Sequence, residues 1–215
     1  MELCRFGVIN RETEQVKQAV RVVSGTAKGR PLKSVPGTGT RPTTDKVKEA
    51  IFSMIGPYFD GGSALDLFAG SGGLGIEALS RGVDSAVFID MEPKAIDTVR
   101  ENLKAARLEA KAEVYRNDAN KALAALERRG RSFDLVFLDP PYRHKFGDEL
   151  MSAMAAKGLL RQEAVIVLEH ESGYEYPEHI SGFRRLRYAL YGETAVSIYC
   201  YGSGSETDMG EGAQE

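Results

Sequence analysis

The sequence predicts an α/β protein built on a mostly parallel sheet with helices on both faces. Short apolar runs alternate with stretches of helical periodicity through the middle of the chain, and two β-type runs, 184–190 and 195–201, follow without a long helix between them. Five parallel units and a terminal antiparallel hairpin give seven strands. The parallel strands are expected at Ala64–Leu67, Ala86–Ile89, Ala112–Tyr115, Leu135–Leu138 and Val165–Leu168, with helices near 73–81, 93–106, 119–129 and 147–157.

The composition of the 215-residue chain fits one domain with a complete core, since hydrophobic residues make up 42% and charged residues 27%. No apolar run approaches the roughly 20 residues that a membrane helix needs, and the N-terminus lacks the apolar stretch of a signal peptide. The two cysteines, Cys4 and Cys200, have no spacing typical of a metal site or a disulfide scaffold. We therefore expect a cytoplasmic protein with no metal and no membrane partner.

The two ends of the chain differ from its body. Residues 1–19 are expected to form a flexible extension, and Val20 is a possible alternative start of the native chain because valine codons can initiate translation in bacteria. Residues 203–215 carry four acids and no base, a composition that predicts a disordered acidic tail. Residues 20–50 instead hold seven bases against two acids. Such a segment can dock phosphates, although the same charges also suit an ordinary solvated surface.

Residues 20–60 are expected to form a small hairpin, an extended arm and one helix. The many glycines and prolines before residue 43 disfavour helix there. Thr43 or Thr44 is positioned to cap a helix whose apolar residues recur at helical spacing as far as Ile55. Lys46 and Lys48 are expected to point away from that apolar stripe. Residues 61–202 would then form the catalytic domain.

A glycine-rich turn links the first parallel strand to the helix that follows it. Gly70, Gly72 and Gly75 match the pattern G-x-G-x-x-G in the strand–turn–helix context that the pattern requires. Small residues let the backbone approach a ligand, and a helix N-terminus offers free N–H groups. Dehydrogenases use the same pattern for dinucleotides, and a tight turn that needs glycine is the plainer interpretation.

Three aspartates bear on the identity of the ligand, and the first of them favours S-adenosylmethionine over a dinucleotide. Asp66 would repel the phosphates of a dinucleotide, but it suits the cationic methionine end of S-adenosylmethionine. Asp90, at the end of the second strand, is placed to accept both ribose hydroxyl protons of either cofactor. Asp118 either accepts from an adenine amino group or caps the following helix.

The sequence Asp139-Pro140-Pro141-Tyr142 directly follows an apolar strand. Two prolines make a stiff, extended loop, so a carboxylate and a proline carbonyl can accept both hydrogens of one –NH2 group. This grip favours a pyramidal nitrogen whose lone pair points at the methyl group of a sulfonium, and Tyr142 offers a flat face for an unstacked base. A proline-rich turn capped by aspartate is the alternative interpretation. The loop predicts methyl transfer to an exocyclic base nitrogen.

With these residues the sequence resembles class I methyltransferases of the D/N-P-P-Y type, and more closely the bacterial 16S rRNA guanine-N2 methyltransferase family known as RsmD. The resemblance covers roughly Val20 to Tyr201, and its most specific part is RVVSGTAKGRPLKSVPGTGTRPTTDKVKEAIFSMI. It implies a Rossmann-like seven-stranded sheet with the order 3-2-1-4-5-7-6, strand 7 antiparallel, and a small N-terminal β-hairpin element. It also implies a monomer that acts on 16S rRNA in small-subunit or pre-30S particles.

The resemblance also assigns roles to individual residues. Catalysis falls to the loop from Asp139 to Tyr142. The cofactor is expected to contact Asp66, Phe68, Gly70, Ser71, Gly72, Gly75, Asp90, Met91, Asp118 and Ala119. The RNA-facing set is expected to be Arg21, Lys28, Arg30, Arg41, Thr43 and Lys46.

Three other functions are compatible with parts of the sequence. An adenine-N6 methyltransferase on RNA or DNA would use the same loop, because adenine also presents an –NH2 group. A nicotinamide-dependent oxidoreductase would use the glycine turn but leave the proline loop unexplained. A non-catalytic ribosome assembly factor would not need Asp139.

Overall fold

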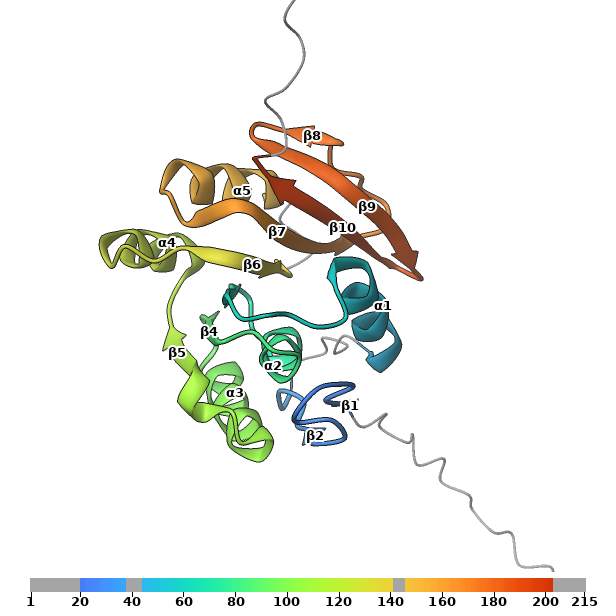
Figure 1. Ribbon diagram of the computed structural model, residues 1–215, viewed down its shortest axis with the longest axis vertical. Coiled ribbons are helices and arrows are strands. Elements are labelled where there is room, and N and C mark those ends of the chain that lie inside the picture. Colours follow the sequence, from blue (N-terminus) through green and yellow to red (C-terminus); the bar gives the residue numbers. More distant parts are fainter. Residues whose placement is uncertain (1–19, 38–43, 141–145, 203–215) are drawn as a thin grey trace, which may run out of the picture.

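The computed structural model describes residues 20–37, 44–140 and 146–202. The extension expected at 1–19 and the tail expected at 203–215 lie outside the described residues. Within them, one sheet of eight strands forms the centre of the molecule, in the order β5-β4-β3-β6-β7-β10-β9-β8 (Figure 1). Its strands are β3 (Ser63–Asp66), β4 (Ser85–Asp90), β5 (Ala112–Arg116), β6 (Phe133–Leu138), β7 (Leu160–Glu171), β8 (His179–Ile180), β9 (Phe183–Tyr191) and β10 (Thr194–Tyr201).

The strand order agrees with the predicted α/β sheet. Strands β5, β4, β3, β6 and β7 are parallel, and β10 pairs antiparallel with both β7 and β9. The seven expected strands therefore stand in the expected order, with the hairpin strand β10 inserted next to β7. The two-residue strand β8 adds an eighth strand at the edge, where it pairs with the start of β9.

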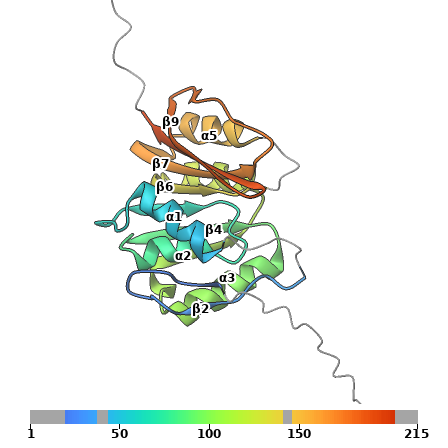
Figure 2. The same ribbon diagram turned by 90° about the vertical axis from the view of Figure 1, so that its right-hand side faces the viewer.

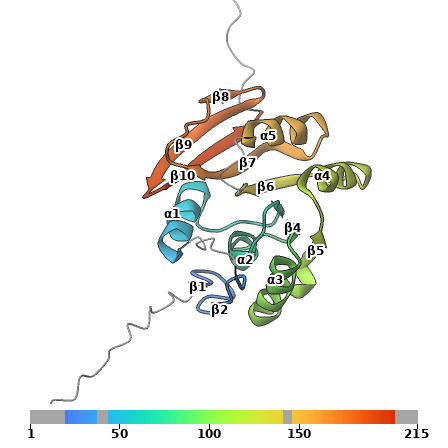
Figure 3. The same cartoon turned by 180° about the vertical axis from the view of Figure 1, so that it is seen from behind.

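Helices cover both faces of this sheet because successive residues of each buried strand point to opposite sides. Ala64 and Phe88 belong to a core on one face, and Leu65 and Val87 belong to a core on the other. The first core is closed by residues from helices α1 (Asp45–Ile55), α2 (Gly73–Ser80) and α3 (Pro93–Ala106). The second core is closed by α4 (Ala119–Arg128) and α5 (Gly147–Ala156), which lie close together in the view from behind (Figure 3). A short 3-10 helix, η1 (Glu109–Lys111), precedes β5.

The N-terminal arm, residues 20–37, packs on the face that carries α2 and α3 (Figure 2). It contains a small hairpin in which β1 (Val20–Arg21) pairs antiparallel with β2 (Pro31–Leu32). Gly25, with φ of +82°, sits so close to the end of α2 that an added Cβ would lie 1.8 Å from the carbonyl oxygen of Ser80. Only glycine fits this contact, so the sequence fixes where the arm meets the helix.

Helix α1 begins at a threonine cap, as its sequence predicts. The Thr44 hydroxyl accepts the Val47 N–H at 3.4 Å. Thr43, the other predicted cap, lies outside the described residues.

The expectation that Lys48 points away from the apolar stripe of α1 is wrong, because the whole residue is buried. Its ammonium donates to the carbonyl oxygen of Arg21 and lies 3.7 Å from Oε2 of Glu77. Burial is possible because an acid from α2 compensates the charge, which local periodicity does not reveal. In the parts of the chain that the structure describes, no helix has the length and apolarity required to span a membrane.

Candidate active site

The predicted site residues gather at the carboxyl edge of the sheet, where its winding direction reverses. From β3 the chain proceeds outward to β4 and β5, and from β6 it proceeds the opposite way to β7. The adjacent ends of β3 and β6 therefore flank a topological switch point, the place where sheets of this kind bind ligands. Asp66 is the last residue of β3, and Asp139 directly follows β6.

The turn between β3 and α2 is held by both neighbouring strands. Leu67 donates its N–H to the Phe137 carbonyl at 3.1 Å, and Ala69 donates to the Ile89 carbonyl at 2.9 Å. Gly70 and Gly72 adopt the left-handed region, with φ of 51° and 76°, so this path favours glycine. The turn thus delivers the N-terminus of α2, with its free N–H groups, to the switch point.

Gly75, the third glycine of the pattern, serves helix–strand packing. It lies inside α2, and an added Cβ would come within 2.4 Å of the Phe88 ring. Its N–H donates to Oδ2 of Asp66 at 3.1 Å. Gly75 therefore lets α2 approach the sheet closely enough to hold the Asp66 carboxylate.

Asp66 is buried and surrounded by like charge. Desolvation raises its pKa to about 7, with repulsion from Asp139 and Asp90 adding to the shift, while the hydrogen bond from Gly75 acts against it. A carboxylate in this setting gains from any cation placed beside it. The site is therefore suited to a positively charged ligand.

Asp90 organises the glycine turn from the end of β4. Its Oδ2 accepts the Gly70 N–H at 2.8 Å, and its Oδ1 accepts the Glu92 N–H at 2.9 Å. Each carboxylate oxygen has further lone-pair capacity. The residue is half-buried.

Asp139 stands across the switch point from the glycine turn. The residue is exposed overall, but desolvation of its carboxyl group raises its pKa to about 6. Pro140, the next residue, is buried. Pro141 and Tyr142 lie outside the described residues, so the structure describes only the first half of the predicted catalytic loop.

The remaining cofactor candidates lie around the same edge. Phe68 is half-buried in the glycine turn, with its ring centroid 6.3 Å from that of Phe146. Met91 follows Asp90 and is 61% exposed. Ser71 lies in the turn and is half-buried.

Asp118 occupies the cap position that its sequence allowed. Its Oδ1 accepts the Lys121 N–H at 3.2 Å at the start of α4, where Ala119 is the first helical residue. The capping interpretation accounts for one oxygen, and the side chain remains exposed.

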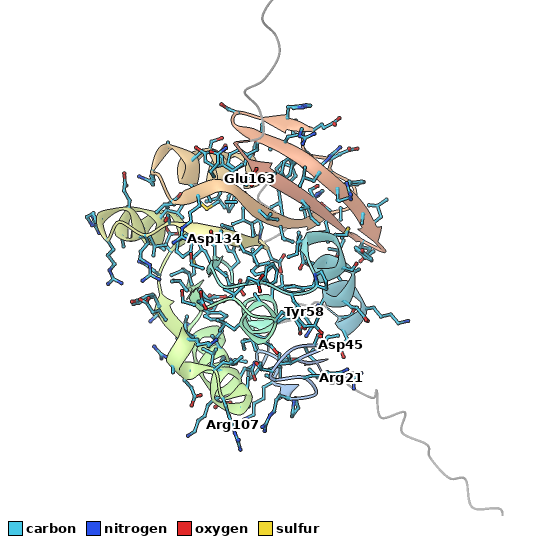
Figure 4. All side chains as sticks on the ribbon, viewed as in Figure 1. Arg21, Asp45, Tyr58, Arg107, Asp134 and Glu163 are labelled. Atoms are coloured by element: carbon cyan, nitrogen blue, oxygen red, sulfur yellow. The ribbon has the colours of Figure 1, made fainter. Side chains whose placement is uncertain are left out.

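The described members of the predicted RNA-facing set lie on the arm and on α1. Lys28, Arg30 and Lys46 are exposed. Arg21 is also exposed, but its Nε donates to Oδ2 of Asp45 at 3.0 Å. Both residues are labelled in Figure 4. Arg41 and Thr43 lie outside the described residues.

Sequence reasoning missed a buried charged cluster beneath the arm, formed by Lys48, Glu77 and Arg81. Glu77 accepts the N–H groups of Val23 and Ser24 at 2.8 and 2.9 Å, and its Oε1 accepts Nε of Arg81 at 2.7 Å. The sequence does contain a signal for it, because Glu77 is the sole charged residue of the otherwise apolar helix α2.

Among the described residues no group of three or more His, Cys, Asp or Glu side chains is arranged to hold a metal ion.

The sheet order, the glycine turn and the acids at the switch point together define a class I methyltransferase fold. A family model described as conserved hypothetical protein 95 matches residues 20–200, and the chain belongs to that family. It is the RsmD family, which the sequence resembles. The resemblance to that family is thereby confirmed.

Named relatives of the chain agree with this assignment. The chain is 53% identical over 180 residues to "Putative rRNA methyltransferase YlbH" of Bacillus subtilis, a match covering 84% of this chain and 98% of the relative. It is 32% identical over 189 residues to ribosomal RNA small subunit methyltransferase D of Escherichia coli K12, covering 88% and 93%. A solved structure described as "Putative methyltransferase yhhF from Escherichia coli" superposes with a TM-score of 0.71 at 35% identity, covering 85% and 98%.

Proposed function

We propose that this protein transfers the methyl group of S-adenosylmethionine to the exocyclic N2 of a guanine in 16S rRNA. The names of its relatives support rRNA as the substrate, and the name of the Escherichia coli relative supports rRNA of the small subunit. The choice of guanine N2 rests on the family resemblance and on the loop that begins at Asp139. We further propose that the protein acts as a monomer on small-subunit or pre-30S particles.

The observation that carries the proposal is the position of Asp139 and Pro140 at the switch point, opposite the glycine turn. Asp66 pairs with Phe137, two residues before Asp139, in the parallel ladder of β3 and β6, so the two aspartates lie at neighbouring strand ends. A group held by Asp139 is therefore close to a ligand held by the glycine turn and Asp66. This proximity is what a transfer between two bound molecules requires.

The residues present fit S-adenosylmethionine. Asp66 would hold the cationic methionine end, Asp90 would accept the ribose hydroxyl groups, and the turn from Gly70 to Gly72 would offer backbone N–H groups to the ligand. Met91 would supply an apolar contact for the adenine ring. When bound, the cofactor supplies a methyl carbon attached to a positively charged sulfur, which departs as a neutral thioether.

The protein's part in the reaction is to hold the amine. The Asp139 carboxylate and the Pro140 carbonyl each accept one N–H of the guanine amino group, so the nitrogen lone pair points at the methyl carbon. As the new N–C bond forms, one of these protons leaves the nitrogen, and the Asp139 carboxylate receives it before releasing it to water. The pKa of Asp139, raised to about 6, makes it a stronger proton acceptor than an ordinary aspartate.

The arm and α1 are proposed to bind the RNA backbone through Lys28, Arg30 and Lys46, together with Arg21, Arg41 and Thr43. Contacts of this kind to phosphates release counterions, so binding and turnover should fall steeply as the salt concentration rises.

The decisive experiment combines the protein with S-adenosylmethionine carrying a labelled methyl group. Naked 16S rRNA and 30S particles, both from cells that lack this methylation, are tested separately. Digestion to nucleosides should give labelled N2-methylguanosine. Labelled N6-methyladenosine would overturn the guanine assignment, and no label in either RNA would overturn methyl transfer to 16S rRNA.

A matched pair of variants tests the role of Asp139. Asp139→Ala should lower kcat by about 100-fold or more, because alanine neither accepts an N–H of the amine nor takes the proton, while S-adenosylhomocysteine still binds. Asp97→Ala, at an aspartate on α3 that is 73% exposed, should leave kcat unchanged. An unchanged kcat in the Asp139 variant would contradict the role of Asp139 in holding the amine and accepting its proton.

A further inference from the structure

Asn102 on α3 joins the glycine turn to the N-terminal arm. Its side chain is buried, although it carries a polar amide. The Asn102 Oδ1 accepts the Lys33 N–H at 2.7 Å, and the Nδ2 donates to the Lys33 carbonyl at 2.9 Å. The same Nδ2 donates its second hydrogen to the Ser71 carbonyl in the glycine turn at 2.8 Å.

These contacts use every donor of the Asn102 amide. They also fix its orientation, since the reversed amide would direct an oxygen at two carbonyl oxygens. Ser71 and Lys33 lie on segments that are far apart in the sequence, and the two meet at this one side chain. A shift of the Ser71 carbonyl is therefore felt directly by the backbone of Lys33.

The segment after Lys33 leads along α3 toward the ribose side of the proposed cofactor site. An added Cβ at Gly37 would lie 3.7 Å from Nζ of Lys94, which is on the first turn of α3. That turn begins just after Asp90 and Met91. The part of the arm bound by Asn102 thus extends toward the residues that we assign to the cofactor.

We propose that Asn102 is a positioning residue that couples occupation of the cofactor site to ordering of the RNA-facing arm. This inference rests on the proposed function. A ligand that immobilises the glycine turn fixes the Ser71 carbonyl, which holds the Asn102 amide and so holds Lys33. The ordering of the arm is then partly complete before RNA arrives, and by reciprocity RNA on the arm strengthens cofactor binding.

Hydrogen exchange of the full chain, with and without S-adenosylhomocysteine, tests this coupling without RNA. In the wild-type protein the ligand should slow exchange of peptides from the glycine turn. It should also slow exchange of the Lys33 amide by about 5-fold, the lower end of usual coupling strengths. Asn102→Ala should keep the effect on the turn and reduce the effect on the arm to less than about 2-fold. A purely structural role would speed exchange equally with and without ligand and leave this ligand-dependent difference intact.

Glu101→Gln is the matched control. It changes the adjacent residue and removes an ion pair with the same Lys33, at 2.9 Å, but leaves the Asn102 contacts in place. Its ligand-dependent protection should equal that of the wild type. In activity assays Asn102→Ala should raise the KM for RNA by more than it lowers kcat.

The outcomes separate the two hypotheses. If the wild-type protein binds S-adenosylhomocysteine and the exchange of the arm does not change, the coupling is absent, whatever the variant does. If the wild-type protein does not bind the ligand at all, the proposed function itself fails and this inference falls with it.

Discussion

Two clusters of charge in this molecule differ in balance. Three acids lie at the switch point, namely Asp66, Asp90 and Asp139. Repulsion from the other two is among the interactions that raise the pKa of Asp66. Beneath the arm, Glu77 meets Lys48 at 3.7 Å and Arg81 at 2.7 Å. Asp45, whose Oδ1 lies 3.7 Å from Nζ of Lys48, adds a second acid, so the two bases of this cluster are compensated, whereas the cluster at the switch point leaves negative charge uncompensated.

The difference separates a structural cluster from a functional one. Buried charges that compensate each other can hold segments together, as Glu77 does when it also binds two backbone N–H groups of the arm. A buried acid beside other acids destabilises the fold unless a cation is supplied from outside. The acid cluster is therefore where a cationic ligand has most to contribute.

Disrupting the balanced cluster should have the largest effect on stability. Glu77→Ala leaves Lys48, which has no exposed surface, without its partner on α2. The free energy of unfolding should fall by about 3–5 kcal/mol, measured by urea denaturation. Replacing Lys48 and Glu77 together by Met and Leu should lose less than the single variant. A greater loss in the double variant would contradict compensation as the role of the pair.

Removing one charge from the acid cluster should instead raise the free energy of unfolding. In the folded protein the pKa of Asp66 is raised from 3.8 to about 7, so between these values the folded state holds more protons than the unfolded state. Stability due to this group is therefore lost as the pH rises through that window. Asp66→Asn removes this loss. The difference in unfolding free energy between the variant and the wild-type protein should therefore shift in favour of the variant by roughly 2–3 kcal/mol between pH 5 and pH 8.

The control for this second prediction is Asp97→Asn, the same substitution at an aspartate that is 73% exposed, which should change the unfolding free energy far less. The Asp66 variant should also lose affinity for S-adenosylmethionine. Improved binding would contradict the assignment of Asp66 to the cationic end of the ligand.

Ligand binding should release protons from the acid cluster. A cation beside Asp66 lowers its pKa, so at pH 7 the bound protein gives up roughly half a proton. Calorimetry of S-adenosylmethionine binding in two buffers of different ionisation enthalpy measures this number. Asp66→Asn should abolish most of the release, and an unchanged value would assign it to another group.

The smallest effect on the free energy of unfolding is expected at an ion pair exposed to solvent. Lys33 and Glu101 pair at 2.9 Å with side chains that are 73% and 58% exposed. Glu101→Gln should change the free energy of unfolding by less than about 0.5 kcal/mol, and added salt should shrink even that. A loss comparable to that of Glu77→Ala would remove the distinction between buried and surface pairs.

Much of the fold followed from local patterns in the sequence. Helix α3 spans Pro93–Ala106, as predicted, and α2 and α4 differ from prediction by one residue. Strand β7 is longer than predicted, running from Leu160 to Glu171, because β10 pairs along most of its length. That pairing joins segments about thirty residues apart in the sequence. The alternation of apolar and polar residues within one strand does not predict which distant strand will pair with it. The two residues of β8 are too few to form a pattern at all.

For the candidate site, sequence placed Asp66, Asp90 and Asp139 at strand ends, and the structure brings those ends to one edge. For Asp118 the sequence allowed either a contact with the ligand or a helix cap, and the structure describes the cap. The contact between Asn102 and Ser71 had no sequence signal, since an asparagine in a helix ordinarily faces solvent.

The sequence alone determined the α/β elements, the glycine turn and the position of the Asp139 loop after its strand. These depend on neighbours within a few residues, and hydrophobic period and turn chemistry encode such neighbours directly. Only the tertiary structure decided that Lys48 is buried, that Asp66 has a raised pKa and that Asn102 ties the arm to the turn. Each of these depends on desolvation and on partners distant in the chain, which exist only after the elements have packed together.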